Sequence, residues 1–313
     1  MANEVKVKDL GQQAIINMLN QVNSFANLEN TQLTAKETQY AVGIIGNINK
    51  RVVSDKELSW SKLDIQGCQL PAQIKRCARL NLQLENQEIF IDIRNNNKTG
   101  LKDINLKLQY QGLEKLMMRY CSFGDKKILR FYKDVICKGD KVIEKPNLAT
   151  GLFELKEHEY YQTDDIEYRN KLENIIGAYA IAYVQEDGKI NPYVCRIDKN
   201  RIERARKSAM TQNIWNADTK KMVIKTAVWE LYAMMKPYML MPQDLVEEFA
   251  KVTENDVDFN KDFINAEVTD VREEVENTVA TENVTAQFEE YDDETGVVNE
   301  KPKFSKIDSD LYD

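Results

Sequence analysis

The sequence contains almost no histidine, and its cysteines are not spaced as a ligand set. A single histidine, His158, is present among 313 residues, which excludes histidine dyads and metal sites built from several histidines. It stands in a polar, acidic stretch, residues 154–165, so we expect a solvated loop residue rather than a general base. The five cysteines are odd in number and form no C-x-x-C pair, so we expect neither a disulfide framework nor a zinc site. A free cysteine behaves as a small hydrophobic residue, which predicts buried, reduced thiols.

Long apolar segments are missing as well. No run approaches the roughly 20 apolar residues that cross a bilayer, and residues 1–9 have no apolar signal core. We therefore expect the protein to reside in a cytoplasm. Hydrophobic residues still make up 42% of the chain, enough to bury a core. The length is compatible with two domains, or with one large domain that carries an appendage.

The chain as a whole has no excess of positive charge, since its net charge is −8. The two signs are nevertheless segregated along the sequence. Residues 252–313 hold 19 acidic and 5 basic residues, a net charge of −14, whereas residues 1–251 hold 32 acidic and 38 basic residues, a net charge of +6. A mildly basic body with an acidic tail indicates that the body contacts nucleic acid.

The composition of residues 252–313 predicts an acidic, mostly disordered, flexible tail. High net charge combined with few large apolar residues cannot offset the entropy of ordering. The last ten residues differ, because they mix Phe304, Ile307, Leu311 and Tyr312 with acidic residues. This mixture suits a peptide that docks on a partner protein, and a solubilising chain end is the alternative.

Hydrophobic periodicity in the body predicts an α+β fold with a helical N-terminal region and β-hairpins packed with helices in a central core. Helices are expected over residues 10–24, 35–48, 71–80, 113–120, 198–210 and 218–236. The second helix follows a T-x-x-E capping box at Thr34, and Asp198 is a plausible N-cap. Hairpins are expected over 88–110 and 178–197, with another β region over 128–143 and a polar excursion over 144–172. On the helix over 71–80 we expect Lys75, Arg76 and Arg79 on the polar side.

A basic block runs from Arg196 to Lys225, where only Asp198, Glu203 and Asp218 oppose nine cations. These are Arg196, Lys199, Arg201, Arg204, Arg206, Lys207, Lys220, Lys221 and Lys225. Adjacent cations bind a phosphate backbone because each contact releases condensed counterions. Trp215, between the two helices, offers a ring for a base to stack on. The alternatives are a charged helix face that is only solvated, and a tryptophan that belongs to the core.

The order of several segments resembles that of the RecT family of phage and prophage single-strand-annealing recombinases. The resemblance covers about residues 60–242. The stretches that carry it are 73–82 (QIKRCARLNL), 108–119 (LQYQGLEKLMMR), 135–140 (VICKGD), 179–188 (YAIAYVQEDG) and 215–237, with Trp215, Met222 and Lys225-Thr-Ala before Pro237. Two departures are present. Gln109 and Gln111 stand where the family often has Gly and Arg, and Trp229 and Glu230 follow where an Arg is usual.

The resemblance implies a bacterial host cytoplasm and annealing of complementary strands without ATP by an oligomer, a ring or a helical filament. Consistent with this, the sequence has no G-x-x-x-x-G-K-[ST] loop, and we expect neither a cofactor nor catalysis. Residues 1–58 are then an oligomerisation region, residues 59–251 the DNA-binding and annealing core, and residues 252–313 a segment for a phage exonuclease or the host single-strand-binding protein. The positions that match motif residues are Tyr110, Lys115, Arg119, Lys221 and Lys225.

Two other functional classes stay open from the sequence. One is a metal-dependent nuclease of phage DNA metabolism, because Glu154-Leu-Lys156 with Asp164 and Asp165 is similar to an acid-x-Lys metal site. The other is a structural phage protein that oligomerises and whose basic face is incidental. Cleavage of DNA with Mg²⁺ would indicate the first, and assembly indifferent to DNA would indicate the second.

Overall fold

The computed structural model describes residues 2–123, 126–147, 152–209 and 212–254. The predicted acidic tail from residue 255 onward, including its docking peptide, lies outside this part of the chain. The α-helices are α1 (Ala2–Leu28), α2 (Ala35–Ser54), α3 (Leu70–Arg79), α4 (Tyr110–Tyr120), α5 (Lys199–Ser208), α6 (Asn213–Ala217), α7 (Thr219–Met235) and α8 (Gln243–Glu254). The strands are β1 (Ile89–Asn95), β2 (Lys102–Leu108), β3 (Ser122–Phe123), β4 (Lys126–Cys137), β5 (Lys141–Asn147), β6 (Leu152–Glu159), β7 (Ile175–Glu186) and β8 (Lys189–Asp198). Short 3-10 turns span Trp60–Lys62, Tyr168–Asn170 and Lys236–Tyr238.

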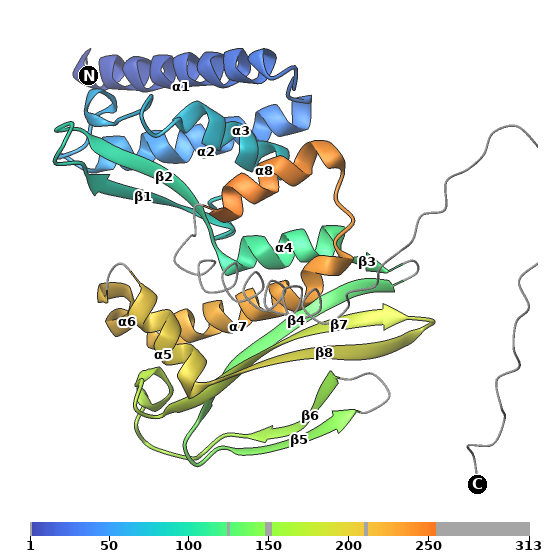
Figure 1. The fold of residues 1–313 in the computed structure, drawn as a ribbon. Coiled ribbons are helices and arrows are strands. Elements are labelled where there is room, and N and C mark those ends of the chain that lie inside the picture. Colours follow the sequence, from blue (N-terminus) through green and yellow to red (C-terminus); the bar gives the residue numbers. More distant parts are fainter. Residues whose placement is uncertain (1, 124–125, 148–151, 210–211, 255–313) are drawn as a thin grey trace, which may run out of the picture. The chain divides into compact units, whose positions relative to one another are not determined.

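The predicted α+β class is confirmed, with helices first and sheets in the middle of the chain (Figure 1). Helices α1, α2 and α3 pack against one another, and the antiparallel hairpin β1–β2 follows them. The second sheet has the order β3-β4-β7-β8-β6-β5. Helix α7 lies along one face of it, against β4, β7 and β8. None of the described helices is both long and apolar enough to cross a membrane.

Local sequence signals decide several element boundaries. The capping box before α2 is formed, since the Thr34 hydroxyl accepts from the Glu37 N–H and the Glu37 carboxylate accepts from the Thr34 N–H. Asp198 caps α5 by accepting from the Arg201 N–H at 2.8 Å. The alternating segments pair in register as β1–β2, from Ile89 opposite Leu108, and as β7–β8. These predictions are therefore confirmed.

The segment predicted as a polar excursion contains the strand β6, so that prediction is wrong in part. Among the described residues, β6 pairs with β5 along its length and with β8 at Phe153 opposite Val194. Leu155 of β6 packs on a small apolar cluster that includes Tyr179 and Ile181. Lys156, Glu157 and Glu159 of the same strand are exposed, and for this reason the segment has a polar composition although it is a strand.

A second correction concerns α3 and the expected start of the tail at residue 252. Lys75 and Arg79, expected on a polar face, are buried at 1% and 8% exposure. They form ion pairs with carboxylates of α8, among them Glu248, which is itself buried. Helix α8 continues to Glu254, with Val252 and Thr253 buried. The acidic composition from residue 252 onward therefore begins inside a packed helix.

Candidate nucleic-acid interface

Helices α4 and α7 lie side by side above the large sheet and carry the positions singled out by their motifs (Figure 1). Tyr110 is the first residue of α4. Lys221 and Lys225 lie one turn apart near the start of α7 and share a side of that helix. The Lys221 side chain forms no ion pair with any residue of the described segments. Fold topology thus brings into contact two helices that begin more than 100 residues apart in the chain.

The Tyr110 ring contacts Lys133, a residue of β4. Lys133 Nζ lies 5.0 Å from the centroid of the Tyr110 ring and 2.5 Å from both carboxylate oxygens of Glu114. Burial raises the pKa of Glu114, although Lys133 opposes that shift. Burial, together with the carboxylates of Glu114 and Asp218, raises the pKa of Tyr110. The phenol is therefore neutral, and a cation covers one face of its ring.

Gly112 allows α4 to approach the chain that leads into β1. A Cβ at this position would lie 2.3 Å from the carbonyl oxygen of Glu88, closer than any side chain tolerates. The same carbonyl accepts from the Gln109 N–H at 2.9 Å. The glycine of this motif is therefore explained by packing between helix and hairpin.

Lys115 and Arg119 lie on another side of α4 and are engaged with the protein. Lys115 Nζ is 2.7 Å from Glu88 Oε2 and 2.5 Å from the carbonyl oxygen of Asn81. An Arg119 guanidinium nitrogen donates to the carbonyl oxygen of Leu80 at 3.1 Å. Both side chains join α4 to the segment between α3 and β1, which is a structural role, and their predicted contact with DNA is not tested by this arrangement.

Lys220 contributes to a polar cluster at one end of the sheet. Its Nζ lies 2.9 Å from Asp134 Oδ1, and the Tyr160 hydroxyl donates to Asp134 Oδ2 at 2.5 Å. Burial alone would raise the pKa of Asp134, but Tyr160 and Lys220 outweigh it and the pKa is lowered. Lys220 therefore compensates a buried carboxylate.

His158 belongs to the same cluster, which corrects its expected place in a solvated loop. It lies on β6 with a side-chain exposure of 6%. Its ring nitrogens lie 2.9 Å from Asp140 Oδ2 and 2.8 Å from the Tyr179 hydroxyl oxygen. Arg169 completes the cluster at 3.0 Å from Asp140 Oδ2. The histidine fastens the β5–β6 hairpin and the following segment to the sheet.

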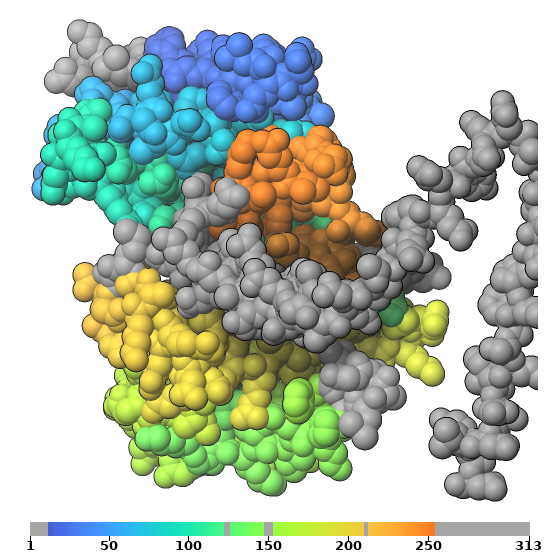
Figure 2. All heavy atoms as spheres, in the orientation of Figure 1, coloured from blue at the N-terminus to red at the C-terminus, as the bar shows by residue number. Residues whose placement is uncertain are grey.

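The cations of α5 divide into engaged and exposed side chains. Arg201 forms an ion pair with Glu230 of α7, and Arg206 Nε donates to Gln212 Oε1 at 3.0 Å. Arg204 and Lys207 are exposed, and neither pairs with a residue of the described ranges. In Figure 2 the yellow spheres of α5 and α6 lie on the face toward the viewer. Lys199, the first residue of α5, is exposed as well, so Lys199, Arg204 and Lys207 are the exposed cations of this helix.

Arg196 is separated from the rest of the basic block. It pairs in register with Tyr179 on β8 and β7, so both side chains point to the sheet face opposite α7. There the Arg196 guanidinium lies 2.5 Å from Glu144 of β5. The continuous block of the sequence is therefore two surfaces in the fold.

Trp215 lies in α6 and is buried, with 1% exposure. It belongs to the main core cluster together with Val223 and Ala227 of α7. The expectation that its ring is offered to a base is wrong in this structure, because stacking requires an accessible face. The alternative, a core tryptophan, describes its position.

The residues of the nuclease hypothesis do not form a ligand set. Glu154 forms an ion pair with Lys156 on β6, and Asp165 Oδ2 lies 2.6 Å from Lys171. The group of potential metal ligands found among the described residues is elsewhere, at Asp64, Cys68 and Asp103. No observation in the described segments therefore favours metal-dependent cleavage at Glu154.

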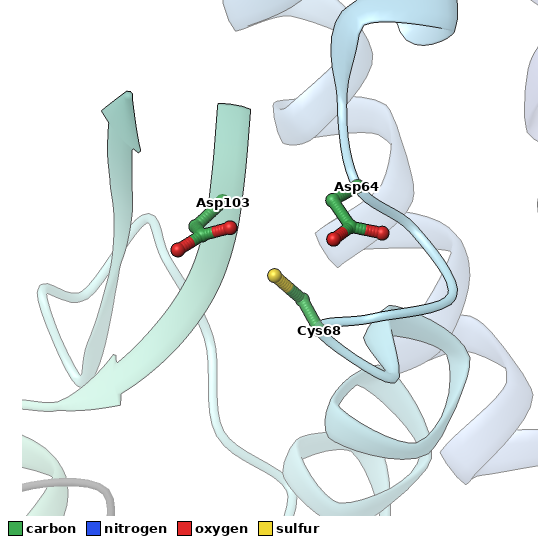
Figure 3. Close-up of side chains that lie close together, drawn as sticks. All are labelled: Asp64, Cys68 and Asp103. Carbon is green, nitrogen blue, oxygen red and sulfur yellow. The ribbon is translucent and has the colours of Figure 1, made fainter. Parts of the chain in front are cut away.

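Asp64, Cys68 and Asp103 approach one another between β2 and the segment before α3 (Figure 3). Each has a partner within the protein. Asp64 Oδ1 accepts a hydrogen bond from the Gly67 N–H at 2.8 Å. Cys68 Sγ accepts one from the Ile104 N–H at 3.4 Å, and Asp103 Oδ1 accepts one from the Asn96 side-chain amide at 2.9 Å. Burial, outweighing the hydrogen bond from Ile104, raises the pKa of the Cys68 thiol, as do the two aspartates. The neutral thiol and the satisfied carboxylates describe a structural junction.

Sequence reasoning missed Lys133 and Glu114. The available signal was the alternation in β4, where Lys133 occupies the same face as Phe131 and Val135, both packed on the core. A lysine on the inward face of a strand needs a partner. That partner, Glu114, is on α4, and only the fold brings the two together.

A protein-family model described as the RecT family matches residues 69–257. The matched range runs from the residue before α3 to just beyond α8 and covers more than half of the chain. No curated protein matches the chain, and no solved structure matches it.

Proposed function

The chain belongs to the RecT family, and on this premise we propose that it binds single-stranded DNA and anneals complementary strands without ATP, as an oligomer, in phage homologous recombination. The family-level activity is single-strand annealing in DNA recombination. The observation that supports the proposal for this chain is the contact between α4, which begins at Tyr110, and α7, which carries Lys221 and Lys225 near its start. Arg204 and Lys207 on α5 are further cations for the same strand.

The proposed mechanism is electrostatic and geometric. Cations hold a strand by its phosphates and release counterions. For single strands, each neutralised phosphate steepens the slope of log Kobs against log salt by about 0.7. The bases stay open to a second strand, so Watson–Crick pairing supplies the sequence specificity. This requires no catalytic residue and no nucleotide triphosphate, in keeping with the absence of a phosphate-binding loop in the sequence.

The remaining regions receive roles within the same proposal. Residues 1–58 contribute to the oligomer, and the acidic segment recruits a phage exonuclease or the host single-strand-binding protein, or competes with DNA for the cations. Because α8 extends to Glu254, the informative deletion removes residues 255–313 and leaves α8 intact. Stronger DNA binding would indicate competition, loss of partner capture would indicate recruitment, and no change in either would indicate a passive solubiliser.

The decisive experiment is annealing of two complementary fluorescent oligonucleotides without ATP at two salt concentrations. We expect rapid annealing at low salt, a steep loss of binding at high salt and growth of the oligomer on DNA. Binding that is indifferent to salt, or assembly indifferent to DNA, would contradict the proposal. Cleavage of labelled DNA with Mg²⁺ that is lost in Glu154→Ala would instead establish a nuclease.

A further inference from the structure

The Tyr110 ring is clamped between α4 and β4 by charged residues that cancel each other. Glu114 lies four residues after Tyr110, so the two share a side of α4. Lys133 rises from β4, contacts both oxygens of Glu114 at 2.5 Å and places its ammonium over the Tyr110 ring. A cation over an aromatic face is attracted by the ring quadrupole. The ring is therefore restrained by a neutral ion pair.

This arrangement removes Lys133 from the cations available to phosphate. The side chains of Glu114 and Lys133 are 12% and 24% exposed. A phosphate that captured Lys133 would leave Glu114 as an unpaired, largely buried carboxylate, which is costly. The cations left for the phosphates are then those of α7, the helix that packs against α4 and carries Lys221 near its start.

The ring itself has the properties of a contact for a base. Tyr110 is partly exposed, and its hydroxyl makes no hydrogen bond to a residue of the described ranges. One face of the ring is occupied by Lys133, and the ring stands near Asp218, the residue that caps α7. Base stacking on an aromatic ring tolerates any sequence because every base has a π-face, which suits a protein that leaves specificity to pairing.

We propose that Tyr110 is a stacking platform for one nucleobase of the bound strand, and that Lys133 and Glu114 are positioning residues that hold its ring. This inference rests on the proposed function and assigns different parts of the strand to different residues. Cations of α7 take the phosphates, whereas the Tyr110 ring takes a base. The tyrosine then fixes the register of the strand without reading its sequence.

The first test measures affinity and base stacking with oligonucleotides that carry 2-aminopurine, whose fluorescence is quenched by stacking. We expect Tyr110→Leu to weaken binding roughly 5- to 150-fold, the effect of one lost base stack, with an unchanged salt slope and with quenching relieved. Tyr110→Phe keeps both affinity and quenching. The matched control is Tyr132→Leu, because Tyr132 is 45% exposed and, as the neighbour of Lys133 in β4, points to the opposite face of the sheet.

The second test addresses the positioning pair with the double variant Glu114→Gln/Lys133→Met, which leaves no unpaired buried charge. We expect affinity to fall about 3- to 10-fold, the effect of losing the cation over the ring, and quenching to weaken, again with an unchanged salt slope. A slope smaller by about 0.7 would show that Lys133 binds a phosphate and would overturn its assignment as a positioning residue.

The outcomes separate this inference from the function on which it rests. If the wild-type protein does not bind single strands, the proposed function fails. If the wild type binds and Tyr110→Leu binds equally well with equal quenching, the platform is wrong and the function stands. Circular dichroism of each variant verifies folding, and loss of quenching in Tyr110→Phe would also contradict a role of the ring.

Discussion

Lys115 and Glu88 form a two-pronged ion pair, with Lys115 Nζ 2.9 and 2.7 Å from the two carboxylate oxygens. Glu88 precedes β1 and is buried at 6% exposure, while Lys115 is in the middle of α4. The pair joins the helix to the hairpin at the point where Gly112 permits close contact. A lysine that occupies a family motif position therefore has a structural partner.

Lys115→Met is expected to lower the free energy of unfolding by about 3 kcal/mol, the low end for breaking a buried ion pair, because it leaves Glu88 buried without its counter-charge. Denaturant titration measures this loss. The double variant Glu88→Gln/Lys115→Met should recover much of it, since a buried pair replaced as a whole costs little. If Lys115→Met is as stable as the wild type but has a smaller salt slope, the lysine belongs to the DNA contacts instead.

Lys221→Ala is expected to behave in the opposite way. Its side chain pairs with no residue of the described segments, so stability should stay within about 0.5 kcal/mol of the wild type. The slope of log Kobs for single-stranded DNA against log salt should become smaller by about 0.7. An unchanged slope would remove Lys221 from the interface.

Arg204→Ala/Lys207→Ala tests the contribution of α5 to binding. Both side chains are exposed. The loss of two phosphate contacts would reduce the slope of log Kobs for single-stranded DNA against log salt by about 1.4. Arg196→Ala is a suitable control, because Arg196 lies on the other face of the sheet, paired with Glu144. Equal effects of the two variants would contradict the separation of the basic block into two surfaces.

Glu248→Gln is expected to destabilise the protein by about 3 kcal/mol, at the low end for breaking a buried ion pair. Glu248 faces Lys75 at 2.8 Å and Arg79 at 3.1 Å, both almost fully buried. Glu247→Gln on the same helix is the control. Its side chain is 75% exposed and pairs along the helix with Lys251, so no measurable change in stability is expected. Similar melting temperatures for the two variants would show that α8 is not held by this cluster.

Stability should fall in acid because of Asp134 and Asp140. Burial opposes ionisation of both, yet hydrogen bonds and cations lower their pKa below the ordinary value of 3.8. As the pH falls, the unfolded chain therefore binds protons before the folded protein does. The stabilisation is fully present above pH 3.8, the ordinary pKa, and is lost as the pH falls through the lower pKa values of the folded protein. Between about pH 5 and about pH 3, Asp140→Asn should lose less free energy of unfolding than the wild type. Parallel curves for the two proteins would contradict this.

The sequence by itself determined what depends on neighbours in the chain. The Thr34 capping box, the Asp198 cap and the alternation of the hairpins are local, because caps and strand faces follow from residues a few positions apart. The order of motifs also determined the family, since it needs no contact between distant residues. The segregation of charge, too, can be counted without a fold.

Only the tertiary structure decided which charges are available. Lys75 meets Glu248, Lys115 meets Glu88, and Arg201 meets Glu230, each across a separation that no local pattern encodes. Whether a cation is solvated or neutralised depends on what packs over it, and that is a property of the assembled elements. The same applies to Trp215, whose burial is created by α7, and to the Tyr110 ring, which is held by a lysine from β4.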